Sequence, residues 1–420
     1  MTMETKPNEP STKQPDPGCT DPMAHFRRMR ELTALGDYGG ALAYASRLAP
    51  VPGSFLAFYT ALFSGHAKLA LGLDHTRLLA EALERERSAA WLTTERLSAR
   101  LQAAIRDRVP LSMIRLGDGE ARFLALGAPW ARDLVSHEEA QCIVSLVWEN
   151  WFGQPIAGVA TADLRSLSEA FDAALADADI LGVSPVRRYQ QQKFTRGYLG
   201  VLERVVGEVV TRHQGVALTS AFAHAELQHR SSFYQELLAG LDFLGVIGPH
   251  PGLARRLAQF HDIGEVREYV VPGESRLPDF ARGRSATPHF PDRFNEVMAS
   301  LQVPRPGAVF LVAAGLLGKV YCHRIRQLGG IAIDAGSIVD AWMGFVTRPG
   351  QHNSAGAWVL PAAVDAGNGG ATATAHRAGA VAEERRKKAV QRRFWSGGRH
   401  VWISTDDADA LRSSGLLGPL

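Results

Sequence analysis

The chain contains the stretch Leu111-Ser-Met-Ile-Arg-Leu-Gly-Asp-Gly-Glu-Ala-Arg-Phe-Leu-Ala-Leu-Gly127. Its apolar residues from Met113 to Leu116 are typical of a strand, and they stop at a Gly-Asp-Gly turn, where glycine permits backbone angles that other residues avoid. Apolar residues return at helical spacing, as at Phe123 and Leu126. The stretch therefore predicts a strand, a tight loop and a helix.

Two carboxylates, Asp118 and Glu120, lie in this loop, at the expected carboxyl edge of a sheet, where open α/β sheets bind ligands. Residues two apart in an extended or turning segment point the same way, so both carboxylates are expected to face one cavity. Such hard oxygen ligands suit Mg²⁺ or Mn²⁺. The alternative is structural: Asp-Gly is a common turn dipeptide, and Glu120 also interacts favourably with a helix dipole. Arg115 either reaches a phosphate or pairs with a carboxylate.

The phrase Ile114-Arg-Leu-Gly-Asp-Gly-Glu120 resembles the R-F-G-D-G-E signature of the GT-D-type glycosyltransferases, a nucleotide-sugar fold distinct from GT-A and GT-B. The chain has Leu116 where the family usually has Phe, which is an apolar exchange. A second run, Ile333-Asp-Ala-Gly-Ser337 with Asp340-Ala-Trp342, resembles the closing A-I-D-I-G segment of the same family. The resemblance covers residues 111–345.

This resemblance implies roles for the two carboxylates. In the family the Asp-x-Glu pair is tied to a metal ion and to the diphosphate of the donor. Asp118 and Glu120 are therefore the expected catalytic and metal-binding residues, and Mn²⁺ or Mg²⁺ is the expected cofactor.

Beyond Gly127 the sequence alternates helical and short strand patterns, which is typical of a parallel sheet. We expect an α/β domain over 111–350, with a doubly wound, mostly parallel, GT-D-like sheet preceded by a small all-α region. The strands are expected at Ile156 to Ala160 (the weakest), Ile180 to Val183, Val216 to Ser220, Phe243 to Ile247, Val266 to Val271, Val309 to Ala313 and Ile331 to Asp334. The helices are expected at Glu138 to Phe152, Leu164 to Ala176, Leu199 to His213, Glu226 to Leu238, Leu253 to Phe260, Arg293 to Leu301 and Leu316 to Leu328.

Small, polar or basic residues near strand ends are candidates for binding the donor, because glycines let a backbone approach a ligand and arginines neutralise phosphates. Gly315-Leu-Leu-Gly-Lys319 lacks the spacing of a P-loop, which argues against ATP hydrolysis. The alternative for the arginines is a solvated loop. The donor-binding candidates are Arg115, Gly117, Gly119, Ser184, Arg187, Gly248, Gly315, Asp334, Gly336 and Ser337.

The regions outside the α/β domain have distinct compositions. Residues 1–22 are polar and proline-rich and predict a disordered tail, whereas 23–110 show only helical patterns. Within them, the run from Gly36 to Pro50 resembles the second helix of a tetratricopeptide repeat, so this region is either a protein-interaction module or a plain helical extension. Residues 351–375 predict a flexible linker, and 376–420 a basic tail.

In the basic tail, Ala382 to Trp395 predicts a basic helix that ends in aromatic residues. Such a helix suits either an anionic membrane surface or plain solvation. The tail from Arg377 to Arg399 carries eight basic and two acidic residues, so a net charge of +3 for the chain leaves −3 for the rest. A mildly acidic body argues against nucleic acid as a partner.

The N-terminus does not resemble a signal peptide, no apolar run is long enough to span a bilayer, and the three cysteines are far apart. We expect a cytoplasmic protein, with peripheral contact at the inner face of the membrane through the basic tail.

Together these patterns predict a metal-dependent glycosyltransferase that moves a sugar from a nucleotide-sugar donor, expected to be UDP-linked, to a glycan, protein-linked or lipid-linked acceptor. Two alternatives stay open. One is a non-catalytic interaction or scaffold protein, and the other is a Rossmann-type methyltransferase in which Asp334 binds a ribose.

Overall fold

The computed structural model describes residues 21–191, 196–213, 215–230, 233–274, 287–345, 347 and 359–361, together with the backbone of 391–396 and 399–404. A few helical residues, among them Asp118, are described by their backbone alone. Residues 1–20 of the expected tail at 1–22, most of the expected linker and most of the basic tail lie outside the described residues. The last two residues of the expected tail, Asp21 and Pro22, instead begin the first helix.

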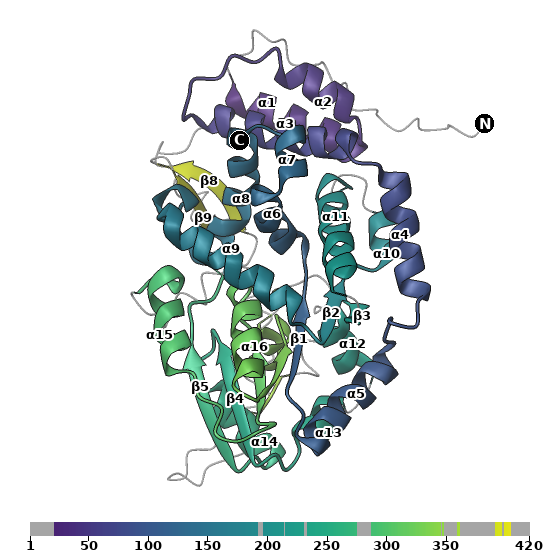
Figure 1. Cartoon of the computed structure of the whole chain (residues 1–420). Helices are drawn as coiled ribbons and strands as arrows, with labels where there is room; N and C mark the ends of the chain where they lie inside the picture. The colour runs from purple at the N-terminus through teal and green to yellow at the C-terminus, as the bar shows by residue number, and fades with distance from the viewer. Residues whose placement is uncertain are drawn as a thin grey trace, which may run out of the picture.

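A parallel sheet of seven strands forms the centre of the molecule, as the alternating pattern predicts (Figure 1). The strands stand in the order β3-β2-β1-β7-β6-β4-β5, and every neighbouring pair is parallel. They are β1 (Leu111–Arg115), β2 (Ile180–Val183), β3 (Ala217–Ser220), β4 (Phe243–Gly248), β5 (Glu265–Val270), β6 (Val309–Val312) and β7 (Ile331–Asp334).

The strand order brings distant parts of the sequence together. From β1 the chain steps outward to β2 and β3, crosses to β4 and β5 at the other edge, and returns through β6 and β7 to the side of β1. Met113 is paired with Ile333 and Arg115 with Gly182, so the carboxyl ends of β7, β1 and β2 lie side by side. Parallel sheets bind ligands at this edge.

Helices cover both faces of the sheet, and alternate strand residues point into two apolar clusters. The helices that pack on the face of Ile114 and Leu116 are α6 (Asp118–Gly127), α8 (His137–Phe152), α9 (Thr161–Ala176), α11 (Arg196–Arg212), α15 (Phe294–Ser300) and α16 (Leu317–Gln327). The helices on the face of Met113 are α5 (Thr94–Asp107), α12 (Ala223–Arg230), α13 (Phe233–Leu238), α14 (Leu253–His261) and α17 (Ile338–Trp342). The short elements α7 (Pro129–Leu134), α10 (Val186–Gln191) and η4 (His289–Arg293) complete this part.

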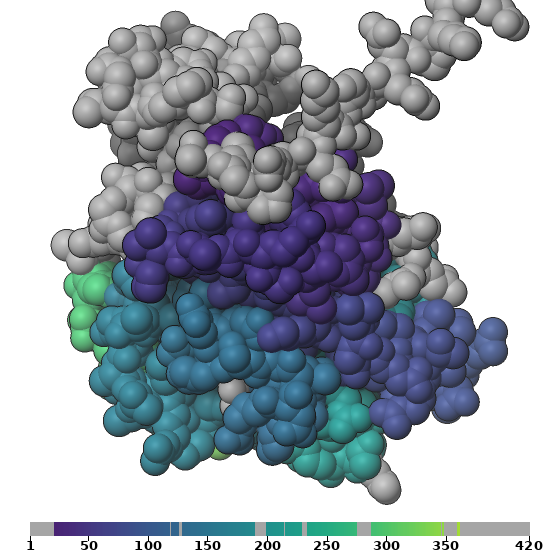
Figure 2. Space-filling view, turned by 90° about the horizontal axis from the view of Figure 1, so that it is seen from above, coloured from purple at the N-terminus to yellow at the C-terminus, as the bar shows by residue number. Residues whose placement is uncertain are grey.

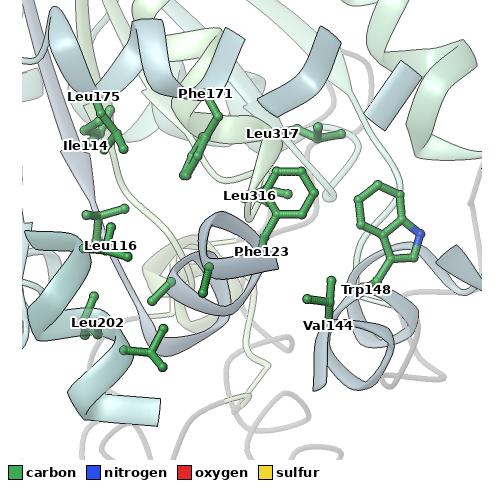
Figure 3. Packing of buried hydrophobic residues seen from close by; sticks show 14 of the residues in the cluster. Ile114, Leu116, Phe123, Val144, Trp148, Phe171, Leu175, Leu202, Leu316 and Leu317 are labelled. Atoms are coloured by element: carbon green, nitrogen blue, oxygen red, sulfur yellow. The ribbon is translucent and has the colours of Figure 1, made fainter. Parts of the chain in front are cut away.

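The packing around α6 fixes the position of the Gly-Asp-Gly turn. Phe123 lies among Val144, Trp148 and Leu316, and Ile114 lies beside Leu175 of α9 (Figure 3). Trp148 is fully buried and Phe123 is 5% exposed. Burying side chains of this size stabilises the fold by about 1.5–3 kcal/mol each, which holds the first turn of α6 against the sheet.

The N-terminal region is helical, as expected, and packs on the α/β part rather than standing apart (Figure 2). Its helices are α1 (Pro22–Leu35), α2 (Tyr38–Ala45), α3 (Phe55–Gly72) and α4 (His75–Arg87). Each of the four begins after an Asp or Ser whose side chain accepts a hydrogen bond from the first turn. Helix α3 contacts α8 and α11, so the two regions share one apolar cluster.

The segment before α5 extends the sheet at the edge of β3. The N–H of Leu92 donates to the carbonyl of Leu218, and the N–H of Leu218 donates to the carbonyl of Ala90. Backbone groups of an edge strand are thereby paired, which protects this edge of the sheet.

Two sequence-based expectations are wrong. Residues Ile156–Gly158 form a 3₁₀ turn, η1, in which Gly158 donates to the carbonyl of Pro155, rather than a strand. The helix expected over Glu226 to Leu238 is helical in α12 and α13, and residues 231–232 between them lie outside the described residues. The expected basic helix does not extend over 391–395, where the chain forms a strand.

This strand, β8 (Gln391–Ser396), pairs antiparallel with β9 (Arg399–Ser404). The sequence offers a reason: Gly397-Gly398 favours a two-residue hairpin turn, and the β-branched and aromatic residues of both strands favour extended backbone. Among the helices that the structure describes, none has the length and apolar character needed to cross a bilayer.

Candidate functional site

Arg115 is the centre of the polar residues at the carboxyl edge of the sheet. Its Nη2 donates to Oδ1 of Asp334 over 2.8 Å and its Nε to the carbonyl of the same residue over 3.1 Å. Its Nη1 donates to the carbonyl of Ala221 and to Nδ1 of His224, at 2.9 and 2.8 Å. Arg115 therefore links the ends of three strands. Of the two possibilities raised by the sequence, the structure shows Arg115 paired with a carboxylate, that of Asp334.

Two glycines leave room for this arginine. A Cβ on Gly182 would lie 2.8 Å from Cγ of Arg115, and a Cβ on Gly336 would overlap its guanidinium group. Gly336 also has a φ of +50°, in the left-handed region that favours glycine. These two positions need glycine because the arginine side chain passes directly over them.

Asp334 stays ionised at this edge. Burial alone would raise the pKa of its carboxyl, but Arg115 and Lys319 outweigh burial and bring the pKa down to about 2. Its Oδ1 is held by Arg115, whereas its Oδ2 lies 3.2 Å from Nζ of Lys319 in a direction that makes no hydrogen bond. Within the described part of the chain, one oxygen of this buried carboxylate therefore has no hydrogen-bond donor.

Lys319 and Glu120 form a second buried ion pair beside Asp334. Nζ of Lys319 donates to Oε1 of Glu120 over 2.7 Å and to the carbonyl of Gly315 over 3.0 Å. Burial would lower the pKa of Lys319, but Asp334 and Glu120 outweigh burial and raise it. Oε2 of Glu120 accepts the N–H of Gly117, which caps α6.

The expected metal pair is not arranged as the sequence argument assumed. Helix α6 begins at Asp118, so Asp118 and Glu120 are the first and third residues of a helix. Residues of a helix turn by about 100° each, so the two-residue alternation of an extended segment does not apply. The side chain of Asp118 lies outside the described atoms.

Glu120 does not fit as a ligand of the expected Mn²⁺ or Mg²⁺. Both of its oxygens already accept hydrogen bonds, and a divalent ion on Oε1 would lie beside the ammonium of Lys319, where like charges repel. Among the residues that the structure describes, no group of three or more His, Cys, Asp or Glu side chains is placed to hold a metal. Of the expected pair, Asp118 alone keeps the metal-binding expectation.

The other donor-binding candidates occupy the same edge with different surroundings. Ser184 follows β2 and is 5% exposed, and its Oγ has no hydrogen-bond partner within the described structure. Arg187 of α10 is exposed, whereas Arg188 lies over the ring of Phe222. The N–H of Val186 at the start of α10 is taken by Glu86 of α4.

The remaining glycine candidates pack against protein. A Cβ on Gly119 would overlap Trp151 and Val147, and a Cβ on Gly315 would lie 3.4 Å from Trp151. Gly248 ends β4 beside Ala313, and Ser337 precedes α17. These residues shape the edge, and Gly315 also accepts from Lys319.

Sequence reasoning missed Lys319 and His224 as members of the site. Lys319 stands in the Gly-Leu-Leu-Gly-Lys run after β6, which is a signal for a strand end. A further pair at this edge joins Nε2 of His250 to Oδ1 of Asp340 over 2.8 Å, and Asp340 also accepts from Oγ1 of Thr347. His250 is therefore an oriented, buried imidazole rather than a loop residue in solvent.

Two hollows lie away from this edge. One is an apolar cavity of about 20 Å³ between α3, α6 and α8. The other is an open, polar groove of about 580 Å³ at the amino edge of the sheet, lined by Arg100, Arg212 and Arg326 among others. Neither contains the residues that meet around Arg115.

The family model described as a GT-D fold-like domain matches residues 92–272. The chain contains a GT-D-like domain. The match begins where Leu92 pairs with β3 and includes Arg115, Glu120 and Ser184, but it ends before Lys319 and Asp334. This GT-D-like domain supports assignment to the glycosyltransferases, in agreement with the resemblance found in the sequence.

Two solved structures are similar to the chain. A selenomethionine-substituted structure of domain of unknown function 1792 is 14% identical, with a TM-score of 0.40, and covers 72% of this chain and 97% of its own. A second, described as showing that this domain has a distinct glycosyltransferase fold, is 13% identical, with a TM-score of 0.38, and covers 71% and 97%. Comparison with curated proteins finds no match.

Proposed function

We propose that the GT-D-like domain transfers a sugar from a nucleotide-sugar donor, expected to be UDP-linked, to a glycan or to a protein-linked or lipid-linked acceptor. The observation that carries the proposal is a pair of buried atoms that have no hydrogen-bond partner among the described residues, Oγ of Ser184 and Oδ2 of Asp334, although Oδ2 forms an ion pair with Lys319. Buried polar atoms are nearly always hydrogen-bonded, and a ligand is one of the groups that completes them. Both atoms belong to residues at the ligand-binding edge of the sheet.

The two atoms offer complementary chemistry. The hydroxyl of Ser184 can donate to a phosphate oxygen, and the ionised carboxylate of Asp334 can accept from hydroxyl groups of a ribose or a sugar. A group with a pKa of about 2 is a poor proton acceptor near neutral pH. Asp334 is therefore proposed to orient the donor rather than to act as a general base.

The charge on the donor must be met by residues around this core. Arg115 and Lys319 are balanced by Asp334 and Glu120, so the four side chains sum to zero. A diphosphate needs further cations as it becomes the leaving group. Arg187, which is exposed and follows Ser184 by three residues, is the described residue that we propose for this role.

Calorimetric titration with UDP and with a panel of nucleotide sugars tests the proposal. Ser184→Ala removes one hydrogen bond to a charged group and should weaken binding about tenfold. Ser112→Ala is the matched control, because Oγ of Ser112 is also buried without a hydrogen-bond partner among the described residues but lies near the amino end of β1, away from the carboxyl edge. Equal affinities in both variants would contradict the placement of the donor.

Turnover separates the proposed activity from its alternatives. A glycosyltransferase should release nucleoside diphosphate from at least one nucleotide sugar, at a rate that an acceptor increases. Binding of S-adenosylmethionine without binding of nucleotides would indicate a methyltransferase instead. Binding of neither class of ligand would favour a non-catalytic role.

A further inference from the structure

The ammonium of Lys319 is enclosed by oxygen atoms from three elements. Oε1 of Glu120 lies at 2.7 Å, the carbonyl oxygen of Gly315 at 3.0 Å and Oδ2 of Asp334 at 3.2 Å. The side chains of the lysine and both acids are at most 10% exposed. A single positive charge therefore lies inside a cage of two carboxylates and one carbonyl.

This cage has the composition of a site for a hard divalent ion. Mg²⁺ and Ca²⁺ bind carboxylate and carbonyl oxygens, and Mn²⁺ shares this preference. Nζ is hydrogen-bonded to Glu120 and to the carbonyl of Gly315, whereas its contact with Oδ2 of Asp334 is an ion pair without a hydrogen bond. All three distances are longer than the bonds that Mg²⁺ forms. The oxygen atoms of the cage thus suit a cation, and their distances suit an ammonium group rather than a metal ion.

We propose that Lys319 is a built-in cation, whose ammonium fills the position that a divalent ion takes among such oxygens, so that Glu120 binds no metal in this protein. Lys319 is a positioning residue in this account. It holds Glu120 against Gly117 at the start of α6 and keeps a positive charge beside Asp334.

The inference goes beyond sugar transfer and holds whatever donor the domain binds. It also differs from the expectation carried by the Asp-x-Glu resemblance, in which both acids are tied to metal. The geometry gives Glu120 to a cation of the protein itself, and the expectation of a metal ion is left to Asp118 alone.

Manganese titration of lysine variants tests the inference without any sugar. Lys319→Met keeps an unbranched side chain of similar length but removes the charge, which leaves the three oxygens facing one another. We expect this variant to bind one Mn²⁺ more than the wild type. Its affinity for Mn²⁺ should be at least tenfold higher than that of the wild type, as measured by calorimetry and by electron paramagnetic resonance. The double variant Lys319→Met/Glu120→Gln should lose the acquired ion.

Lys68→Met is the matched control. Lys68 also pairs with a glutamate, Glu139, over 2.7 Å, but its side chain is 41% exposed and the pair lies between α3 and α8. Removing this charge should create no Mn²⁺ site, because one carboxylate, that of Glu139, is the acid paired with Lys68 among the described residues, whereas two carboxylates and a carbonyl surround Lys319. A gain in Lys68→Met equal to that in Lys319→Met would overturn the inference.

A second arm does not depend on the folding of any lysine variant. The Mn²⁺ affinity of wild-type protein should be unchanged in Glu120→Gln, because Glu120 is already occupied by Lys319. A loss of Mn²⁺ binding in Glu120→Gln would overturn the inference, as would a folded Lys319→Met that gains no ion. Failure of the nucleotide-sugar panel, by contrast, would contradict only the proposed transfer.

Discussion

Asp334→Asn should destabilise the protein strongly, because it removes a carboxylate that faces two buried cations. Breaking a buried ion pair by removing one partner costs about 3–5 kcal/mol. An independent measure comes from the pKa of about 2, which lies below the ordinary 3.8 and corresponds to about 2 kcal/mol of stabilisation of the ionised form. We therefore expect a loss of about 2–4 kcal/mol.

Thermal and urea unfolding measure this loss. With an unfolding entropy of about 2.1 cal/mol/K per residue, each kcal/mol shifts the melting temperature of a 420-residue chain by about 1 °C, so the expected decrease is on the order of 2–5 °C. Asp242→Asn is the control, since Asp242 pairs with Arg108 and Arg305 at the exposed surface and should cost less than about 1 kcal/mol. A loss below about 1 kcal/mol in Asp334→Asn would refute the role assigned to the ion pairs.

The stability that Asp334 contributes should depend on pH in a definite direction. The folded-state pKa of Asp334 is lowered, so its contribution is fully present above the unfolded pKa of 3.8 and is lost as pH falls through about 2. The stability difference between wild type and Asp334→Asn should therefore shrink between pH 5 and pH 2. Adding Lys319→Met to Asp334→Asn should cost less than the sum of the single variants, because the two side chains are in contact.

Three further predictions concern other parts of the chain. Gly336→Ala should lower the free energy of unfolding by about 1–2 kcal/mol because of its left-handed backbone, and by more because its Cβ overlaps Arg115. Gly329 is also left-handed but has open space at Cβ, so Gly329→Ala should show the backbone cost alone. Equal urea midpoints for the two variants would contradict this. Burial raises the pKa of Glu203 to about 7 despite its pairing with Arg85. The wild type should therefore lose up to about 3 kcal/mol of stability relative to Glu203→Gln as the pH rises from 4.5 through 7. Parallel pH profiles of urea stability for the two proteins would show that the glutamate does not titrate in this range. Deleting 376–420 should abolish co-sedimentation with anionic liposomes, and unchanged sedimentation would exclude the basic tail as a membrane contact.

Local patterns in the sequence were sufficient for most elements of the fold. Strands such as Val309–Val312 are short apolar runs between glycines and prolines, and helices such as His137–Phe152 have a serine cap and a helical period. The strand order was not predictable in this way, because the pairing of β1 with β7 joins residues some two hundred positions apart. Residues 391–396 were misassigned because charge content favoured a helix while the Gly-Gly pair favoured a hairpin.

The candidate site was predictable at the level of its edge but not of its contacts. Arg115, Ser184 and Asp334 all follow or end apolar runs, so their common location could be inferred. The partner of Glu120 could not, because Lys319 lies 199 residues further along the chain and its Gly-Leu-Leu-Gly-Lys run marks a strand end without indicating a partner. The expectation that Asp118 and Glu120 point the same way rested on the two-residue alternation of an extended or turning segment. It does not apply, because α6 already begins at Asp118.

Photochemical cross-linking with a photoreactive UDP-sugar tests most directly whether the carboxyl edge binds the donor. Mass spectrometry of the labelled peptides should find the adduct after β2, around Ser184 to Tyr189, or after β7, around Asp334 to Trp342, and excess UDP should prevent it. Labelling at the groove of Arg100, Arg212 and Arg326, on the opposite edge of the sheet, would contradict the account.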